Sequence, residues 1–179
     1  MIDSPFTMLK ALEQNSITCA RPLPKLERVE EYWHGIGFKA LETYFVIALT
    51  EVSEVLRNSK LTKVPGIVKW LLGIANLRGK LLPVVDLQGF IMGENSFQTT
   101  NTQQILVFNH KEALHGLLIE KIIGLQKIAY QYHKTDINEL NPLYQPFIQG
   151  KFTTPDQHWL ILDSKKIIEN DKFYKVIAG

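Results

Sequence analysis

The chain has 179 residues, 45% of them hydrophobic, with 20 lysines and arginines against 18 aspartates and glutamates. This length suits one compact domain, or two tightly fused subdomains, with a substantial core. The near-balanced charge, a formal +2 on scattered residues, argues against a nucleic-acid-binding surface. The single cysteine, Cys19, excludes an internal disulfide and fits a reducing cytoplasm.

The N-terminus predicts a short amphipathic helix followed by an extended linker. Ser4 fits an N-cap and Pro5 the first helical position, and apolar residues follow at helical spacing to about Asn15. Residues 17–33 contain prolines and solvated charges and read as extended. Residues 1–34 are therefore either a loosely draped arm or a docking element for another protein. Charged residues interrupt every apolar run, so we expect a soluble protein without a signal peptide or a membrane span.

From Gly35 onward, short strands dominate the pattern, so we place the folded domain at residues 35–179. Brief helices are expected over residues 67–72, 87–92 and 165–170, the last capped by Ser164. The polar loop of residues 93–104 marks the expected crossing between two subdomains. The expected strands cover residues 35–38, 44–49, 50–56, 105–108, 114–123, 125–130, 147–153 and 158–162.

The most informative segment is GIANLRGKLLPVVDL, residues 73–87, which predicts two apolar strands around a two-residue turn. Gly79 supplies the positive φ that such a turn needs. Pro83 suits an edge position or a bulge, since it has no backbone donor. Arg78 would be exposed at the tip of this hairpin.

This hairpin and four other segments, in order, resemble the CheW-like domain family over about residues 35–168. The other segments are GIGFKALETYFVIALTEVSEVL (35–56), KVPGIVKWLLG (63–73), GLLIEKIIG (116–124) and WLILD (159–163). Within the family, the opening SPFTMLKALEQ is similar to that of the PilI-type adaptors of type IV pilus chemosensory systems. Departures from the family pattern are Glu120-Lys121, in place of an acidic pair, and Val68, in place of a second loop proline.

The resemblance implies a mostly β fold of two packed, intertwined five-stranded SH3-like β-barrels, with a few short helices and an N-terminal helical arm. It also implies no catalytic activity and no cofactor. The residues agree with this, because the five histidines have no metal-site spacing and the sequence has no nucleophile elbow or phosphate-binding loop. Asp86 and Asp163 each end an apolar strand, and we interpret both as helix N-caps rather than as a catalytic pair. Trp159 is expected in the core, whereas Trp70 is either a lid over the first barrel or an interface anchor.

In function, the resemblance implies a cytoplasmic adaptor, recruited to membrane-associated receptor arrays, that couples a methyl-accepting chemoreceptor to a CheA-type histidine kinase and controls twitching motility. It implies receptor contact for Val52, Glu54, Gly73 and Arg78, and it assigns no residue to the kinase. Gly73 would let a partner helix approach closely, and Arg78 would bind a partner carboxylate.

Three alternatives stay open from the sequence. Glu54 and Arg78 could instead form an intramolecular surface pair. The chain could be a general flagellar CheW adaptor. A β-barrel that binds single-stranded nucleic acid is the third, although the charge disfavours that partner.

Overall fold

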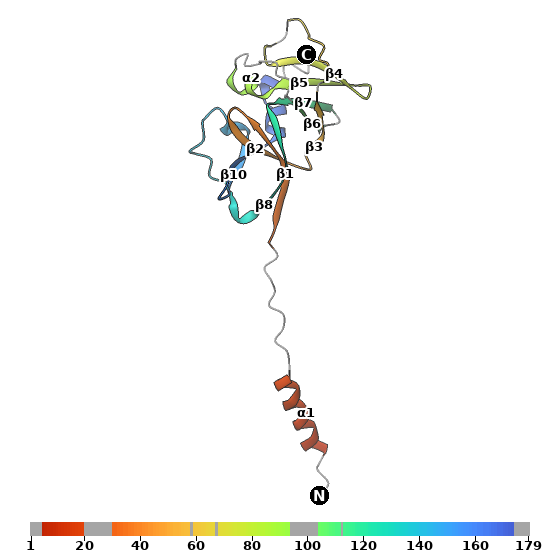
Figure 1. Ribbon diagram of the computed structural model, residues 1–179, viewed down its shortest axis with the longest axis vertical. Coiled ribbons are helices and arrows are strands. Elements are labelled where there is room, and N and C mark those ends of the chain that lie inside the picture. Colours follow the sequence, from red (N-terminus) through yellow and green to blue (C-terminus); the bar gives the residue numbers. More distant parts are fainter. Residues whose placement is uncertain are drawn as a thin grey trace. The chain divides into compact units, whose positions relative to one another are not determined.

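The computed structural model describes residues 5–19, 30–57, 59–66, 68–93, 104–111 and 113–173. Residues 1–30 and 31–179 form two separate compact units (Figure 1). The first contains helix α1, Pro5–Cys19, which begins at the predicted proline and continues past the expected end near Asn15. The expected cap, Ser4, lies outside the described residues. The second unit contains all the strands among the described residues, and its first strand already begins at Tyr32.

The first sheet has six strands in the order β8-β1-β2-β11-β10-β9. All neighbours are antiparallel except β2 and β11, which are parallel. The sixth strand, β9, has only two residues. The longer strands of this sheet are therefore five, the number expected for each subdomain. The bounds are β1 Tyr32–Ala40, β2 Thr43–Ala48, β8 Lys121–Ala129, β9 His133–Lys134, β10 Ile148–Thr153 and β11 His158–Leu162.

The second sheet has five strands in the order β3-β6-β7-β5-β4, with β5 and β7 parallel. Its strands are β3 Val52–Arg57, β4 Leu71–Leu77, β5 Lys80–Asp86, β6 Gln104–His110 and β7 Ala113–Ile119. Two α-helices, α2 Leu87–Met92 and α3 Ser164–Ile168, and two 3₁₀ turns, Tyr130–Tyr132 and Gln145–Phe147, complete the unit. The prediction of a mostly β fold with two packed subdomains and a few short helices is confirmed.

The crossings between the sheets differ from the expected one. Strands β3 to β7 all belong to the second sheet, so the chain crosses at residues 49–51 and returns at Glu120. The crossing predicted at residues 93–104 is wrong, because β5 and β6, on either side of it, share a sheet. Both true crossings are so short that the sequence runs through them without a composition change. Residues 94–103 themselves lie outside the described residues.

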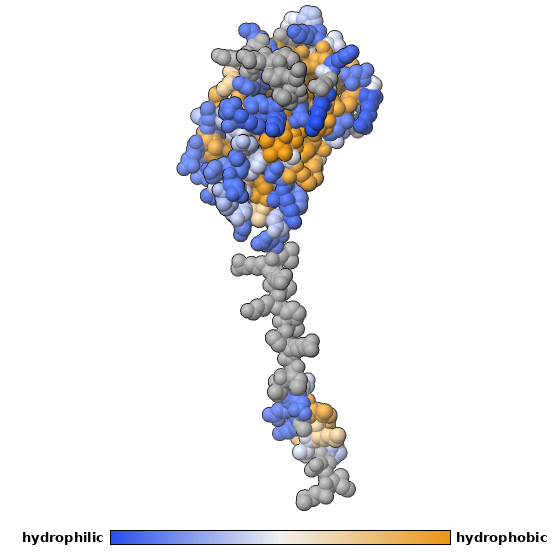
Figure 2. Space-filling view, in the orientation of Figure 1, coloured by the Kyte–Doolittle hydropathy of each residue, from blue (hydrophilic) through white to orange (hydrophobic). Residues whose placement is uncertain are grey.

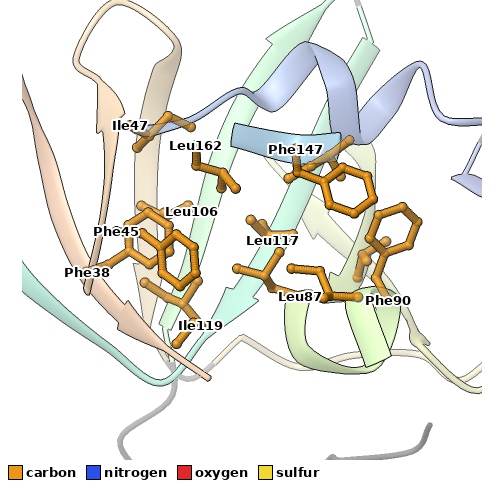
Figure 3. Packing of buried hydrophobic residues seen from close by; sticks show 14 of the residues in the cluster. Phe38, Phe45, Ile47, Leu87, Phe90, Leu106, Leu117, Ile119, Phe147 and Leu162 are labelled. Atoms are coloured by element: carbon orange, nitrogen blue, oxygen red, sulfur yellow. The ribbon is translucent and has the colours of Figure 1, made fainter. Parts of the chain in front are cut away.

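A single large core fills the space between the two sheets (Figure 3). Phe38 and Phe45 of the first sheet stack with ring centroids 5.6 Å apart, and Leu106 and Leu117 of the second sheet belong to the same buried cluster. Smaller clusters lie inside each subdomain, one around Leu82 and Val107 and one around Trp159. Since burial of apolar area dominates folding free energy, this central core holds the subdomains as one unit.

Trp159 is buried as predicted, and Trp70 is buried as well. The Trp70 ring stacks on Phe173 at 6.1 Å and meets the edge of Phe90 at 5.2 Å. Because only 8% of Trp70 is exposed, it is part of the central core and not an interface anchor. The helix expected over residues 67–72 is also wrong, since the described residues there form a turn that leads into β4 at Leu71.

Both aspartates interpreted as caps are caps. The Asp86 carboxylate accepts a hydrogen bond from the Gln88 backbone N–H at 3.1 Å, at the start of α2. The Asp163 carboxylate accepts from the Lys165 and Lys166 N–H groups at 2.9 and 3.3 Å, so Asp163, not Ser164, caps α3. Ser164 is the first helical residue, and its N–H and hydroxyl both donate to the Glu51 carboxylate. Each aspartate thus satisfies backbone donors that a helix start leaves unpaired.

Candidate partner-binding surface

The hairpin between β4 and β5 has the predicted two-residue turn. Leu77 pairs with Lys80, and the residues between them, Arg78 and Gly79, have φ of 52° and 83°, as a type I′ turn requires. The Asn76 side chain fixes the turn by accepting a hydrogen bond from the Gly79 N–H at 2.8 Å. Pro83 lies in a central strand but precedes Val84, the first β5 residue paired with β7. The absence of its N–H therefore breaks no ladder bond to β7.

Arg78 and Glu54, 24 residues apart in the sequence, form an ion pair with Nη2 and Oε2 3.2 Å apart. Glu54 comes from β3, and the Arg78 side chain is 82% exposed. The intramolecular pair considered as an alternative is therefore present, but an exposed pair contributes only about 0–1 kcal/mol to stability. A guanidinium carries five N–H donors, and the bond to Glu54 engages one nitrogen, so this arginine can also bind a partner carboxylate.

Val52, at the start of β3, is half-buried and packs against the central core. The β3–β6 ladder shifts register between Val52 and Glu54, which marks a bulge at Ser53. Val52 thus offers a partner only part of its side chain, beside Glu54, whose side chain is 27% exposed.

Gly73 does not lie on an open surface. It is buried, its φ is 146°, and a Cβ built there would stand 2.4 Å from the carbonyl oxygen of Thr62. Thr62 and Ile74 exchange two backbone hydrogen bonds of 2.9 Å, which hold this segment against β4. The space expected for a partner helix is thus filled by the chain itself. Any contribution of Gly73 to binding must act through the position of the hairpin.

Sequence reasoning missed a second feature, an apolar seam between the two sheets. Leu125 of β8 pairs with Ile36, and Val55 of β3 pairs with Leu106. Paired residues of neighbouring strands point to the same face, and both Ile36 and Leu106 contact the central core. Leu125 and Val55 therefore lie where that core reaches the surface.

We call this surface the β3–β8 seam and define it by the exposed residues Val55, Ile123 and Leu125, the last 65% exposed. Figure 2 shows hydrophobic side chains gathered in this region of the body. Buried Gln104 joins the two sides of the seam: it pairs with Arg57 of β3, and its side-chain oxygen accepts from the Ile122 N–H of β8 at 2.7 Å. In the sequence, these apolar residues lie within predicted strands, where apolar residues are expected to be buried.

The corner between β7 and β8 carries the Glu120-Lys121 departure from the family pattern. Glu120 lies 3.8 Å from the Lys39 ammonium, which also donates to Glu42 at 2.8 Å. The hydrogen bond with Glu42, and to a lesser degree the charges of Glu42 and Glu120, raises the pKa of Lys39. Glu120 thus has a partner within its own chain.

The histidines show no metal-binding arrangement. Among the described residues, no group of three or more histidines, cysteines or acidic residues could hold a metal ion. His115 is buried against the Phe173 ring, and this burial, with a smaller effect of the neighbouring His110, lowers its pKa. Neutral His115 is therefore a core residue.

Helices long and apolar enough to span a membrane are absent from the described part of the chain.

Comparison with known proteins agrees with these observations. Residues 34–172 match the CheW-like domain family. The chain is 32% identical over 175 residues to Protein PilI of Pseudomonas aeruginosa, a match that covers 98% of this chain and 97% of that protein. It is 27% identical over 134 residues to the chemotaxis protein CheW of Thermotoga maritima, covering 75% of this chain and 86% of that protein. The fold is similar to that of the scaffolding protein TtCheW from Thermoanaerobacter tengcongensis, with a TM-score of 0.69 at 21% identity, over 79% of this chain and 96% of that one.

Proposed function

Because the chain belongs to the CheW-like domain family, whose members are non-catalytic scaffold proteins, we propose that it couples a methyl-accepting chemoreceptor to a CheA-type histidine kinase. We further propose that this coupling serves a type IV pilus chemosensory system and controls twitching motility. The similarity to PilI over nearly the whole chain supports this setting above that of a general flagellar adaptor, since the T. maritima CheW match leaves a quarter of the chain uncovered. Such an adaptor works in the cytoplasm, at membrane-associated receptor arrays.

The observation that carries the proposal is the Arg78–Glu54 pair, which joins the tip of the β4–β5 hairpin to β3 and leaves the Arg78 side chain 82% exposed. The tip of a chemoreceptor is helical, and a helix binds through apolar anchors flanked by charged contacts. The β3–β8 seam supplies exposed apolar side chains, one of them from β3, the strand that carries Glu54. We therefore assign receptor contact to Glu54, Arg78, the accessible part of Val52 and the seam, with Gly73 as a positioning residue.

The test is a binding measurement between the purified chain and two fragments from the same genome, the receptor tip and the kinase regulatory domain. Arg78→Glu should weaken receptor binding at least tenfold, because it places a carboxylate where the receptor carboxylate would bind. Lys80→Glu is the matched control, since it makes the same charge change two residues away on the same exposed hairpin. Kinase binding should be unchanged in both variants.

Equal receptor binding by the Arg78→Glu variant and the wild type would refute the assignment of Arg78. Binding of neither fragment by the folded wild-type chain would refute the adaptor function itself. To separate the pilus setting from the flagellar one, the receptor tips of both systems should be compared, and tighter binding of the flagellar tip would contradict the proposal.

A further inference from the structure

Helix α1 has an apolar face on one side. Four of its large apolar side chains are between 58% and 71% exposed, namely Phe6, Met8, Leu9 and Leu12. Figure 2 shows hydrophobic surface on one side of this helix and hydrophilic surface on the other. An isolated helix of 15 residues is marginal in water, so this face needs a partner to cover it.

The charge of the helix narrows the class of partner. Its only charged residues are Lys10 and Glu13, which cancel. A helix that binds anionic lipid or nucleic acid carries more lysine and arginine than acidic residues, and α1 has no such excess. The partner is therefore an apolar groove on a protein.

The second unit of the chain carries such a groove, which we call the Tyr130 groove. It is open, has a volume of about 630 Å³, and is lined by residues 32–34, residues 48–50 and Tyr130. Two of its apolar side chains are well exposed, Leu49 at 43% and Tyr130 at 48%. Its lining contains no carboxylate, and the Lys127 ammonium stands 4.1 Å from the centre of the Tyr32 ring. Glu13, beside the apolar face of α1, complements this positive charge.

The helix and part of the groove also share a region of sequence. The CheW-like family match begins at residue 34, so α1, Tyr32 and Trp33 all precede it. The match to PilI covers 98% of the chain and so extends into this region. Helix α1 and the first two groove residues thus lie outside the family match, whereas the other lining residues of the groove lie within it.

We propose that α1 of one copy docks its apolar face into the Tyr130 groove of a second copy, and that two copies exchange their helices reciprocally. Residues 20–31, which join α1 to β1, can span about 40 Å when extended, enough to reach a neighbouring molecule. Reciprocal exchange uses the same contact twice and closes a twofold dimer. This adds self-association to the proposed adaptor function and does not depend on it.

The test is sedimentation velocity on the full chain over a range of micromolar concentrations. The arm variant Leu9→Asp/Leu12→Asp places two charges on the apolar face. Its matched control, Thr7→Asp/Gln14→Asp, places the same charges on the opposite face. The groove variant is Leu49→Asp, with Tyr130→Ser as a second substitution, and its control is Leu81→Asp at an exposed leucine of the other sheet.

We expect the wild type and both controls to double in mass with concentration, and the arm and groove variants to remain monomers. An equimolar mixture of the arm and groove variants should recover a dimer of lower affinity than that of the wild type, because one intact helix meets one intact groove and only one of the two contacts forms. Thermal melting checks that each variant is folded.

Three results would overturn the proposal. One is a wild type that stays monomeric at every concentration. This is also the result expected if α1 docks in the groove of its own molecule. The second is a dimer that persists in the arm variant, since association would then use another surface. The third is a mixture of folded arm and groove variants that stays monomeric.

Discussion

The conformation of Gly73 couples the β4–β5 hairpin to the segment that precedes it. A side chain at this position meets the Thr62 carbonyl oxygen at 2.4 Å and must also adopt a φ of 146°. The position is thus closed to every other residue type by the chain's own backbone. Gly73 therefore shapes the hairpin surface but is not itself exposed for contact with a partner.

Gly73→Ala should therefore destabilise the protein by at least about 2 kcal/mol, through backbone strain and the displacement of residues 61–63. Urea unfolding measures this loss. Gly66→Ala is the matched control, because Gly66 also has a positive φ, 77°, but no atom lies within 4 Å of its built Cβ. A fully stable Gly73→Ala variant that loses receptor binding would restore Gly73 as a contact residue.

His115 should make the stability depend on pH. Burial, with a smaller effect of His110, lowers its pKa in the folded state, so the unfolded chain binds a proton more readily. The stabilisation is complete above the unfolded pKa of about 6.5 and is lost as the pH falls below it towards the folded pKa. The free energy of unfolding should thus fall between pH 7.5 and pH 5.5.

The variant His115→Leu should lose that part of the pH dependence. Among the described residues, His110 acts electrostatically on His115, and Glu169 lies 3.2 Å from His110 and 3.1 Å from Lys111. Lys111 lowers the pKa of Glu169, whose effect on stability therefore falls in a more acidic range. An unchanged slope between pH 7.5 and pH 5.5 in the variant would show that another group is responsible.

At the scale of elements, one side-chain hydrogen bond joins the two sheets at the seam. Gln104→Leu removes the acceptor of the Ile122 N–H and leaves a part-buried donor unpaired. The expected cost is about 1–3 kcal/mol in urea unfolding. Gln157→Leu is the control, because the Gln157 side chain donates to a carbonyl in an exposed hairpin. Equal effects of the two substitutions would mean that the seam is held by apolar packing alone.

Several elements follow from local pattern. The hairpin of β4 and β5, helix α2 and the β10–β11 hairpin each form where turn residues, caps and alternation indicated. The expected helix over residues 67–72 failed because Trp70 is buried in a turn and the partly buried Leu71 already belongs to β4. Tertiary burial here overrides a weak local periodicity.

At the scale of the whole molecule, the two compact units should separate cleanly. Deletion of residues 1–30 removes none of the strands and none of the central-core residues that the structure describes. The truncated chain should therefore keep the thermal stability of the full chain and, under the proposed function, its affinity for receptor and kinase fragments. Circular dichroism and the binding measurements check both. A large loss of stability on truncation would show that the arm is part of the fold.

The sequence by itself determined the family, the mostly β architecture, the turn that exposes Arg78 and the roles of Asp86 and Asp163 as caps. Each of these depends on residues close together in the chain, where φ preferences and hydrogen-bonding side chains act locally. Only the tertiary structure decided that the chain crosses between sheets at residues 49–51 and Glu120, that Gly73 is covered by Thr62, and that Leu125 and Val55 share a surface seam. These depend on which strands become neighbours, and strand pairing is selected by burial of the whole apolar surface at once.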